Sequence, residues 1–192
     1  MAMTHNCTFD PDAHRYTIAG KVVPSVTQVL GVMLPGWKAS EWHLERGRAV
    51  HACAAMIARG KKFDYDLQIA GQVAACLKFF AEVRPVVLAV EHRVFSLHHQ
   101  YAGTLDLLIQ WGPVHTAVVD WKSTLSDQVP YQVAAYAEAY GEQEDALTPR
   151  YGFGVELREN GRYQMGEVYD LKMWRRKWVE MLRQYKAKEG GE

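Results

Sequence analysis

Several features that the sequence lacks limit its class. The chain has 192 residues but only three cysteines (Cys7, Cys53 and Cys76), and none of them forms a CxxC pair. This scarcity argues against a disulfide framework and against a structural zinc or iron–sulfur site, and free thiols suit a reducing interior. Because no run of about 18 apolar residues occurs, we expect no transmembrane helix and no membrane association. The polar N-terminus has no apolar signal core, which predicts a cytoplasmic protein.

An excess of charge of either sign is also absent. The chain carries 22 Lys and Arg residues against 22 Asp and Glu residues, so its formal net charge is +0. If it binds nucleic acid, the positive charge must therefore be local. No GxxxxGK[ST] segment is present, which excludes a helicase motor of that type. A hydrophobic content of 48% and a charged content of 23% are ordinary for a soluble globular protein, and the length fits one domain.

Helical spacing and turn residues predict the elements. We expect a hairpin at 7–23, a short helix that a capping box at Ser25 begins and Leu34-Pro35-Gly36 ends, and a helix at 40–58 with Ser40 as its cap. A helix at 67–83 is expected to bury one stripe of apolar residues, formed by Ile69, Val73, Leu77 and Phe80. Further helices are expected at 127–140 and 171–188.

Strand-like segments lie at 86–97, 101–111 and 114–122, separated by short turns, which predicts a β-meander. A second hairpin is expected where 151–157 and 163–169 flank the turn residues Glu159-Asn160-Gly161. Together these elements predict an α/β fold with a central mixed, largely antiparallel sheet flanked by helices.

Two of these strands carry acidic residues in apolar surroundings. Asp106 interrupts the apolar run 105–109, whereas Asp120 and Lys122 end the run 117–119. Because strand side chains alternate, Asp120 and Lys122 share one face and Trp121 points to the other. If the strands pair through the turn at 112–113, Asp106 and Asp120 approach each other.

Two converging carboxylates repel unless a cation neutralises them, and magnesium prefers carboxylate oxygens. Such an ion can activate water and stabilise a reacting phosphate, and a lysine two residues from a ligand adds fixed positive charge. Taken alone, however, an Asp-x-Lys at a strand end is commonly a surface ion pair. The two acids together, each in an apolar strand, favour the catalytic interpretation.

These residues resemble the active-site strands of PD-(D/E)XK nucleases, and the RecB-type branch in particular, which includes phage exonucleases and the mitochondrial genome maintenance exonuclease. The matching segments occur in the family's order: Pro24–Leu30, Gly47-Arg48-Ala49-Val50-His51, Gly103-Thr104-Leu105-Asp106, Val118-Val119-Asp120-Trp121-Lys122-Ser123 and Gln132-Val133-Ala134-Ala135-Tyr136. The resemblance implies a restriction-endonuclease-like core. It also implies that residues 1–192 form one nuclease domain: an N-terminal hairpin and short helix (1–35), a catalytic core (36–140), and a C-terminal hairpin and basic helix (141–192).

The resemblance also implies roles for single residues. His51, Asp106, Asp120 and the Trp121 carbonyl would bind one or two Mg²⁺ or Mn²⁺ ions, and Lys122 would be the catalytic lysine. Gln132 and Tyr136 would contact DNA or brace the site, although their spacing equally fits helix packing. Glu91 is a possible additional ligand, with a solvent-facing residue paired to Arg93 as the alternative. Gly47 lies one turn before His51 on the same face, where its missing side chain would let another chain or a phosphate approach closely.

The segment 171–188 combines an apolar stripe with a basic face that includes Arg175, Arg176 and Lys177. It predicts a helix packed on the core, and its basic face fits a DNA backbone. The sequence thus predicts a Mg²⁺- or Mn²⁺-dependent deoxyribonuclease, an exonuclease acting on single-stranded DNA or on duplexes with ends. The resemblance suggests a bacterial or phage-infected cell, and a homo-oligomer or a recombination or replication partner protein is possible. The alternatives are a structure-specific endonuclease and a catalytically silent DNA-binding module.

Overall fold

A computed structural model describes residues 7–190, except 12, 14, 36–39 and 144–147. Its centre is a six-stranded mixed sheet. The strands are β4 (Val87–Ser96), β5 (Tyr101–Trp111), β6 (His115–Lys122), β7 (Tyr151–Leu157) and β8 (Tyr163–Met165), in that order, with β9 (Tyr169–Asp170) paired to β7. Neighbouring strands are antiparallel except β6 and β7, which are parallel. The α/β class and the largely antiparallel sheet are therefore confirmed.

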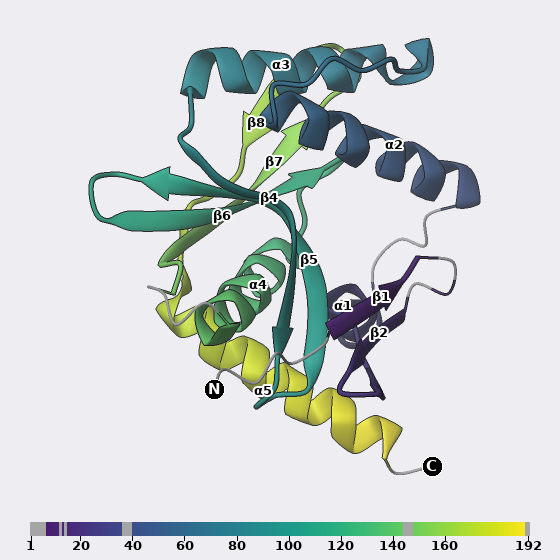
Figure 1. The fold of residues 1–192 in the computed structure, drawn as a ribbon, viewed down its shortest axis with the longest axis vertical. Helices are drawn as coiled ribbons and strands as arrows, with labels where there is room; N and C mark the ends of the chain where they lie inside the picture. The colour runs from purple at the N-terminus through teal and green to yellow at the C-terminus, as the bar shows by residue number, and fades with distance from the viewer. Residues whose placement is uncertain (1–6, 12, 14, 36–39, 144–147, 191–192) are drawn as a thin grey trace.

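Two layers of helices cover the sheet (Figure 1). On one side lie α2 (Glu41–Ala58) and α3 (Ala70–Val83), and on the other lie α1 (Val26–Met33), α4 (Val129–Gln143) and α5 (Leu171–Glu189). Strand alternation explains this division, because Leu107 packs with α2 and α3 whereas Leu108, the next residue, packs with α1, α4 and α5. The parallel pairing of β6 and β7 requires a long crossover, and α4 provides it.

The meander and both helix caps agree with the sequence. Strands β4, β5 and β6 follow one another as antiparallel neighbours. Ser25 and Gln28 form the reciprocal capping box of α1, with Gln28 N donating to Ser25 Oγ at 3.1 Å and Ser25 N donating to Gln28 Oε1 at 2.8 Å. Ser40 caps α2. The Leu34-Pro35-Gly36 stop is confirmed at Leu34, the C-cap of α1, while Gly36 lies outside the described residues.

The N-terminal hairpin is confirmed but extends to a third strand. Strands β1 (Cys7–Asp10), β2 (Arg15–Ile18) and β3 (Lys21–Val23) form a separate antiparallel sheet. The extra turn is possible because Gly20 adopts a φ of +80°. This small sheet packs on the start of β5, where the Tyr16 hydroxyl and Thr104 Oγ1 are hydrogen-bonded at 2.9 Å.

Two local expectations are wrong. A 3-10 helix, η1 (Leu67–Ile69), precedes α3, and the centre of the buried face of α3 runs through Gln72, Cys76 and Phe79. Leu77 lies about 100° around the helix from Cys76, and it is 50% exposed rather than part of the stripe. The expected strand 163–169 is broken into β8 and β9. The last hydrogen bond at the end of β8 runs from Gly166 N to Gly154 O at 2.8 Å, and residues 167 and 168 are not part of the sheet.

The remaining helices match their predicted positions within a few residues. The buried side chains of α5 include Leu171, Trp178 and Met181 from the expected apolar stripe. No helix among the described residues is long and apolar enough to cross a bilayer.

The corrected face of α3 leads to a stability prediction. We expect Phe79→Ala to lower the free energy of unfolding by about 3–5 kcal/mol, because Phe79 is fully buried against Trp121. Leu77→Ala is the matched control and should cost less than about 1 kcal/mol, because half of its side chain is already in water. Urea unfolding of both variants measures this, and equal losses would contradict the assigned face.

Candidate active site

Three neighbouring strands each place an acidic residue in one row across the sheet. The pairing of β5 with β6 stops at Leu107 and Val119, and the next residues are Asp106 and Asp120. Between β4 and β5, the pairs Val90–Leu107 and His92–Leu105 bracket Glu91 and Asp106. Like charges opposite one another in a sheet are destabilising, so the site is electrostatically unfavourable unless positive charge is supplied.

Asp106 lies at the centre of this row and is only 7% exposed. Its Oδ2 accepts a hydrogen bond from the Trp121 backbone N–H at 2.8 Å. Its Oδ1 lies 3.1 Å from Nδ1 of His51, which α2 carries. The carboxylate is thus anchored to β6 on one side and to the helix layer on the other.

Glu91 joins the same cluster through an unusual backbone conformation. Its φ is +49°, in the left-handed region that non-glycine residues rarely adopt in a strand. Such a residue costs about 1–3 kcal/mol, and strain of this kind occurs preferentially at functional sites. One ligand atom each from His51, Glu91 and Asp106 lies within 4.8 Å of the others. These three residues could hold a metal ion.

Asp120 is fixed by a network from β6 and α4. Gln132 Nε2 donates to Asp120 Oδ1 at 2.7 Å and also reaches the Tyr136 hydroxyl at 3.1 Å. Lys122 Nζ lies 2.5 Å from Asp120 Oδ2 and donates to Gln132 Oε1 at 2.9 Å. Gln132 and Tyr136, predicted at helical spacing, therefore lie against the predicted Asp-x-Lys pair.

The donor set fits a hard divalent cation. Asp120 is 1% exposed, and its Oδ2 has the Lys122 ammonium nearby but no aligned hydrogen bond within the described part of the chain. A buried carboxylate oxygen without a hydrogen bond is costly unless another positive group binds it. Carboxylate oxygens are the ligands that hard divalent cations prefer. Asp120 lies outside the group of three ligand atoms but next to Asp106 in the row.

The acidic row shifts the proton affinity of His51. Burial by itself lowers the pKa of His51, but the charge of Asp106 and its hydrogen bond outweigh burial and raise the pKa to about 9. Burial in turn raises the pKa of Asp106, but the charge and hydrogen bond of His51, with Lys122 and the Trp121 N–H, hold it below its ordinary value. Without a metal ion, the positive charge of a protonated His51 partly neutralises the Asp106 carboxylate.

The other two carboxyl groups shift the opposite way. Partial burial, with the charge of Asp106 in support, raises the pKa of Glu91 to about 7. Burial and Asp106 also raise the pKa of Asp120, which Lys122 offsets only in part. The row therefore raises the pKa of two of its three carboxyl groups, as expected for like charges held close together without a cation.

An open cleft of about 630 Å³ lies beside the cluster. One of its walls is a face of α2 in which His43, Gly47 and His51 recur every fourth residue. The other walls come from the end of β6 (Trp121–Thr124) and from the end of β7 with its turn (Glu156–Glu159). A Cβ added at Gly47 would meet nothing within 4 Å, so this glycine leaves free space in the cleft rather than allowing close packing.

Glycine is required at Gly103 for a different reason. A Cβ there would come within 2.7 Å of Cε1 of Tyr136, so the ring of Tyr136 packs directly on the backbone of β5. This contact explains why a glycine precedes Asp106 by three residues, because Tyr136 in turn contacts Gln132. The sequence motif marks a packing requirement of the site.

The basic residues of α5 do not reach the cleft. Arg175 pairs with Glu138 of α4 at 3.3 Å, and Lys177 lies over the ring of Trp174 at 4.0 Å. Arg176 is exposed. None of the three is among the cleft-lining residues within the described ranges. A contact between this helix and DNA remains a prediction.

The structure also brings residues to the cleft that were not singled out from the sequence. Arg46 and Gln72 come from α2 and α3, and Glu159 belongs to a segment that was interpreted only as a turn. Helical spacing from His51 through Gly47 to His43 was the available signal for this wall. Nothing in the sequence pairs it with the distant hairpin.

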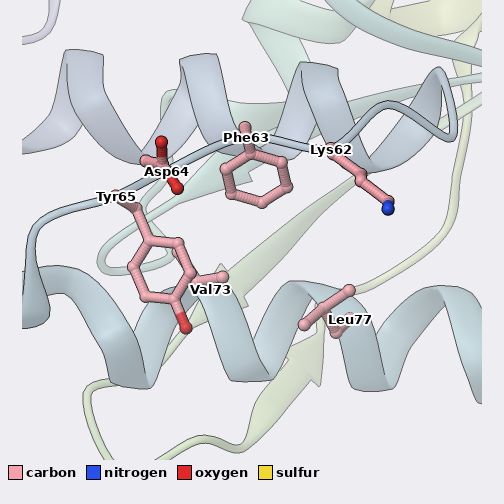
Figure 2. Close-up of a pocket in the computed structure, with 6 residues that line it drawn as sticks. All are labelled: Lys62, Phe63, Asp64, Tyr65, Val73 and Leu77. Carbon is pink, nitrogen blue, oxygen red and sulfur yellow. The ribbon is translucent and has the colours of Figure 1, made fainter.

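A second hollow, of about 500 Å³, lies between α3 and the segment that follows α2. Figure 2 shows Lys62, Phe63, Asp64 and Tyr65 along the segment above α3, with the ring of Tyr65 reaching down beside Val73. Its lining is largely apolar and holds no convergent acids. The cleft beside Asp106 is therefore the better candidate for chemistry.

No protein-family model matches the chain. No curated protein matches it significantly in sequence. Among solved structures the chain is similar to LHK-Exo, crystallised in complex with dAMP, with 12% sequence identity and a TM-score of 0.44 over 86% of this chain and 89% of that one. The function proposed below rests on the residues of the site.

The pKa shifts predict how metal binding depends on pH. Folding raises the pKa of Glu91 to about 7 and the pKa of His51 to about 9. The stability that each protonated group contributes is therefore complete at low pH, and it is lost as the pH rises through that group's pKa in the folded chain. A cation must displace these same protons. We therefore expect Mn²⁺ to raise the melting temperature more at about pH 8 than at about pH 6.

Thermal denaturation with EDTA or with Mn²⁺ at each pH measures this difference. Glu91→Gln should remove part of the pH dependence in EDTA and weaken the stabilisation by Mn²⁺. Glu167→Gln, on an exposed loop, is the control. A Mn²⁺ effect that does not change with pH would contradict the proposed ligands.

Proposed function

We propose that the chain is a Mg²⁺- or Mn²⁺-dependent deoxyribonuclease that hydrolyses phosphodiester bonds from DNA ends. The observation that carries this proposal is the acidic row of Glu91, Asp106 and Asp120, which meets His51 and Lys122 beside an open cleft. Two buried acids, a third at the surface and a fixed ammonium supply what cleavage of a polyanion needs.

His51, Glu91 and Asp106 would hold the cation, and Asp120, whose Oδ2 accepts no aligned hydrogen bond from the described residues, would join them. A divalent cation there would neutralise the carboxylates, polarise the scissile phosphate and lower the pKa of the attacking water. The Trp121 carbonyl is a further proposed ligand. Its own N–H already holds Asp106 in place at 2.8 Å.

Lys122 would stabilise the charge that develops on the reacting phosphate. Its Nζ lies between Asp120 Oδ2 and Gln132 Oε1, at 2.5 and 2.9 Å, and these two oxygens fix the ammonium in position. Gln132 would orient both Asp120 and Lys122, since one amide contacts both side chains. Tyr136 would support Gln132 rather than touch DNA, because it is only 4% exposed.

The preference for DNA ends is supported by the order of motifs in the sequence, which resembles exonucleases of the RecB type. A structure-specific endonuclease would use the same residues, so the form of the substrate distinguishes the two. A silent binding module is less consistent with the site, because all acids of the row and the lysine are present together.

The test is cleavage of end-labelled linear DNA, single- and double-stranded, and of a closed circle, in Mg²⁺ or Mn²⁺. We expect degradation of linear DNA only. Asp106→Asn and Lys122→Met should each lower the rate at least about 100-fold, because each removes a group that acts on the reacting phosphate. Lys21→Met, an exposed lysine in β3, is the control.

Cleavage of the circle would replace the exonuclease by an endonuclease with the same site. Full activity of both site variants would refute the assignment of the centre. Binding of DNA without cleavage in either metal would favour the silent module.

Gly47 gives a prediction in which stability and function change in opposite directions. Gly47→Ala should raise the free energy of unfolding by up to about 1 kcal/mol, because alanine favours the helix and its Cβ meets no atom within 4 Å. The same methyl group would enter the cleft, so DNA cleavage should fall. Urea unfolding and cleavage assays test this pair of effects, and an unchanged rate would show that DNA does not approach Gly47.

A further inference from the structure

Arg46 lies in the cleft wall formed by α2, and its side chain is 18% exposed. Across the cleft is Glu159, in the turn between β7 and β8. Arg46 Nη1 and Glu159 Oε1 are 2.5 Å apart, although the Glu159 side chain is 72% exposed. A partly buried cation is therefore neutralised by a carboxylate that remains largely in solvent.

Several groups orient the guanidinium of Arg46 without satisfying it. Its Cζ atom lies 5.1 Å from the ring centroid of Trp42, one turn earlier on α2. The Gln72 amide, with its oxygen turned toward Arg46, accepts a hydrogen bond from Nη2. Nε is buried and has no hydrogen-bond partner within the described part of the chain. A held guanidinium with a spare donor is suited to an oxyanion that accepts more than one hydrogen bond.

The Glu159 contact is weak enough to be exchanged. An ion pair with one exposed partner contributes only about 0–1 kcal/mol, because water screens it and the side chain loses freedom. A phosphate can accept from two donors of a guanidinium at once, which a single-point carboxylate contact does not do. A phosphate that enters the cleft can therefore displace Glu159 from Arg46.

The cleft has room and further donors for a polyanion that extends past the reacting bond. Gly47, adjacent to Arg46, leaves open space, and Ser123 and Thr124 line the cleft after Lys122. The hairpin wall repeats the pattern of a neutralised cation, because Arg158 Nη2 and Glu156 Oε2 are 3.0 Å apart. DNA carries a phosphate at every nucleotide, so a second cation in the same cleft matches the substrate of the proposed nuclease.

We propose that Arg46 binds a second phosphate of the bound DNA strand, distinct from the phosphate at which the strand is cut. In the free protein the Glu159 carboxylate occupies this position until DNA displaces it. The inference rests on the proposed function for its ligand, DNA. Arg46 is then a binding residue outside the metal cluster, and Glu159 lowers affinity by competing for it.

The direct test is DNA binding without turnover. A fluorescent duplex with single-stranded overhangs is titrated in Ca²⁺ at several salt concentrations and followed by anisotropy. We expect Arg46→Met to weaken binding about tenfold and to reduce the slope of log affinity against log salt by about one, as the loss of one phosphate contact does. Glu159→Gln should tighten binding several-fold.

Matched controls separate this role from general charge effects. Arg48→Met removes an exposed arginine two residues further along α2 that does not line the cleft, and it should leave affinity near the wild-type value. The double variant Arg46→Met with Glu159→Gln should bind like Arg46→Met alone, because Glu159 acts only through Arg46. Melting temperatures of all variants show whether they are folded, and Arg46→Lys retains the charge if the methionine variant is not.

Two results would overturn the inference: DNA affinity of Arg46→Met equal to that of the wild type, or weaker DNA binding by Glu159→Gln. Either result would mean that the ion pair only holds the turn between β7 and β8 against α2. Hydrolysis of thymidine 5′-(p-nitrophenyl phosphate) distinguishes failure of the centre itself. Arg46→Met should lower kcat/KM on this substrate much less than on DNA, because the substrate offers no second phosphate. If neither protein hydrolyses it or DNA, the proposed function fails, while the binding data still decide the role of Arg46.

Discussion

Repulsion within one row of carboxylates is the constraint on which the site depends. Glu91, Asp106 and Asp120 come from three adjacent strands at matching positions, where hydrogen-bonding geometry holds neighbouring chains close together. The sheet cannot relax by moving a strand, because Leu107 and Val119, beside these acids, are fully buried. The unfavourable electrostatics must instead be met locally, by protons on Glu91 and His51 or by a bound cation.

The two helix layers meet at this row and supply different groups to it. The α2 layer brings His51 to Asp106, whereas the α4 layer brings Gln132 to Asp120 and Lys122. Both layers are anchored by the same strands, whose alternate residues face opposite sides. A site at the junction of two cores is rigid without lying inside either of them. The open cleft beside it gives access to a substrate as large as a nucleic acid strand.

Sequence reasoning was reliable where a local pattern determines the geometry. Strand alternation and turn residues were enough to predict that Asp106 lies next to Asp120. The capping residues Ser25 and Ser40 were enough to predict where α1 and α2 begin. The positive φ of Glu91 has no such signal, because glutamate is a poor residue for that conformation and only the surrounding sheet imposes it. Contacts between distant segments were equally hidden, and Glu159 was recognisable as a turn residue but not as the partner of Arg46.

A net charge of zero does not prevent DNA binding, because positive charge in the cleft is present but paired with acids in the free protein. Arg46 is paired with Glu159, Arg158 with Glu156, and Lys122 with Asp120, so the charges cancel in the free protein. What matters for DNA binding is then which of these acids can leave. Asp120 is buried and fixed by Gln132, whereas Glu159 is mostly exposed. Because the acids differ in this way, a phosphate can take over Arg46 from Glu159 while Asp120 continues to hold Lys122 at the centre.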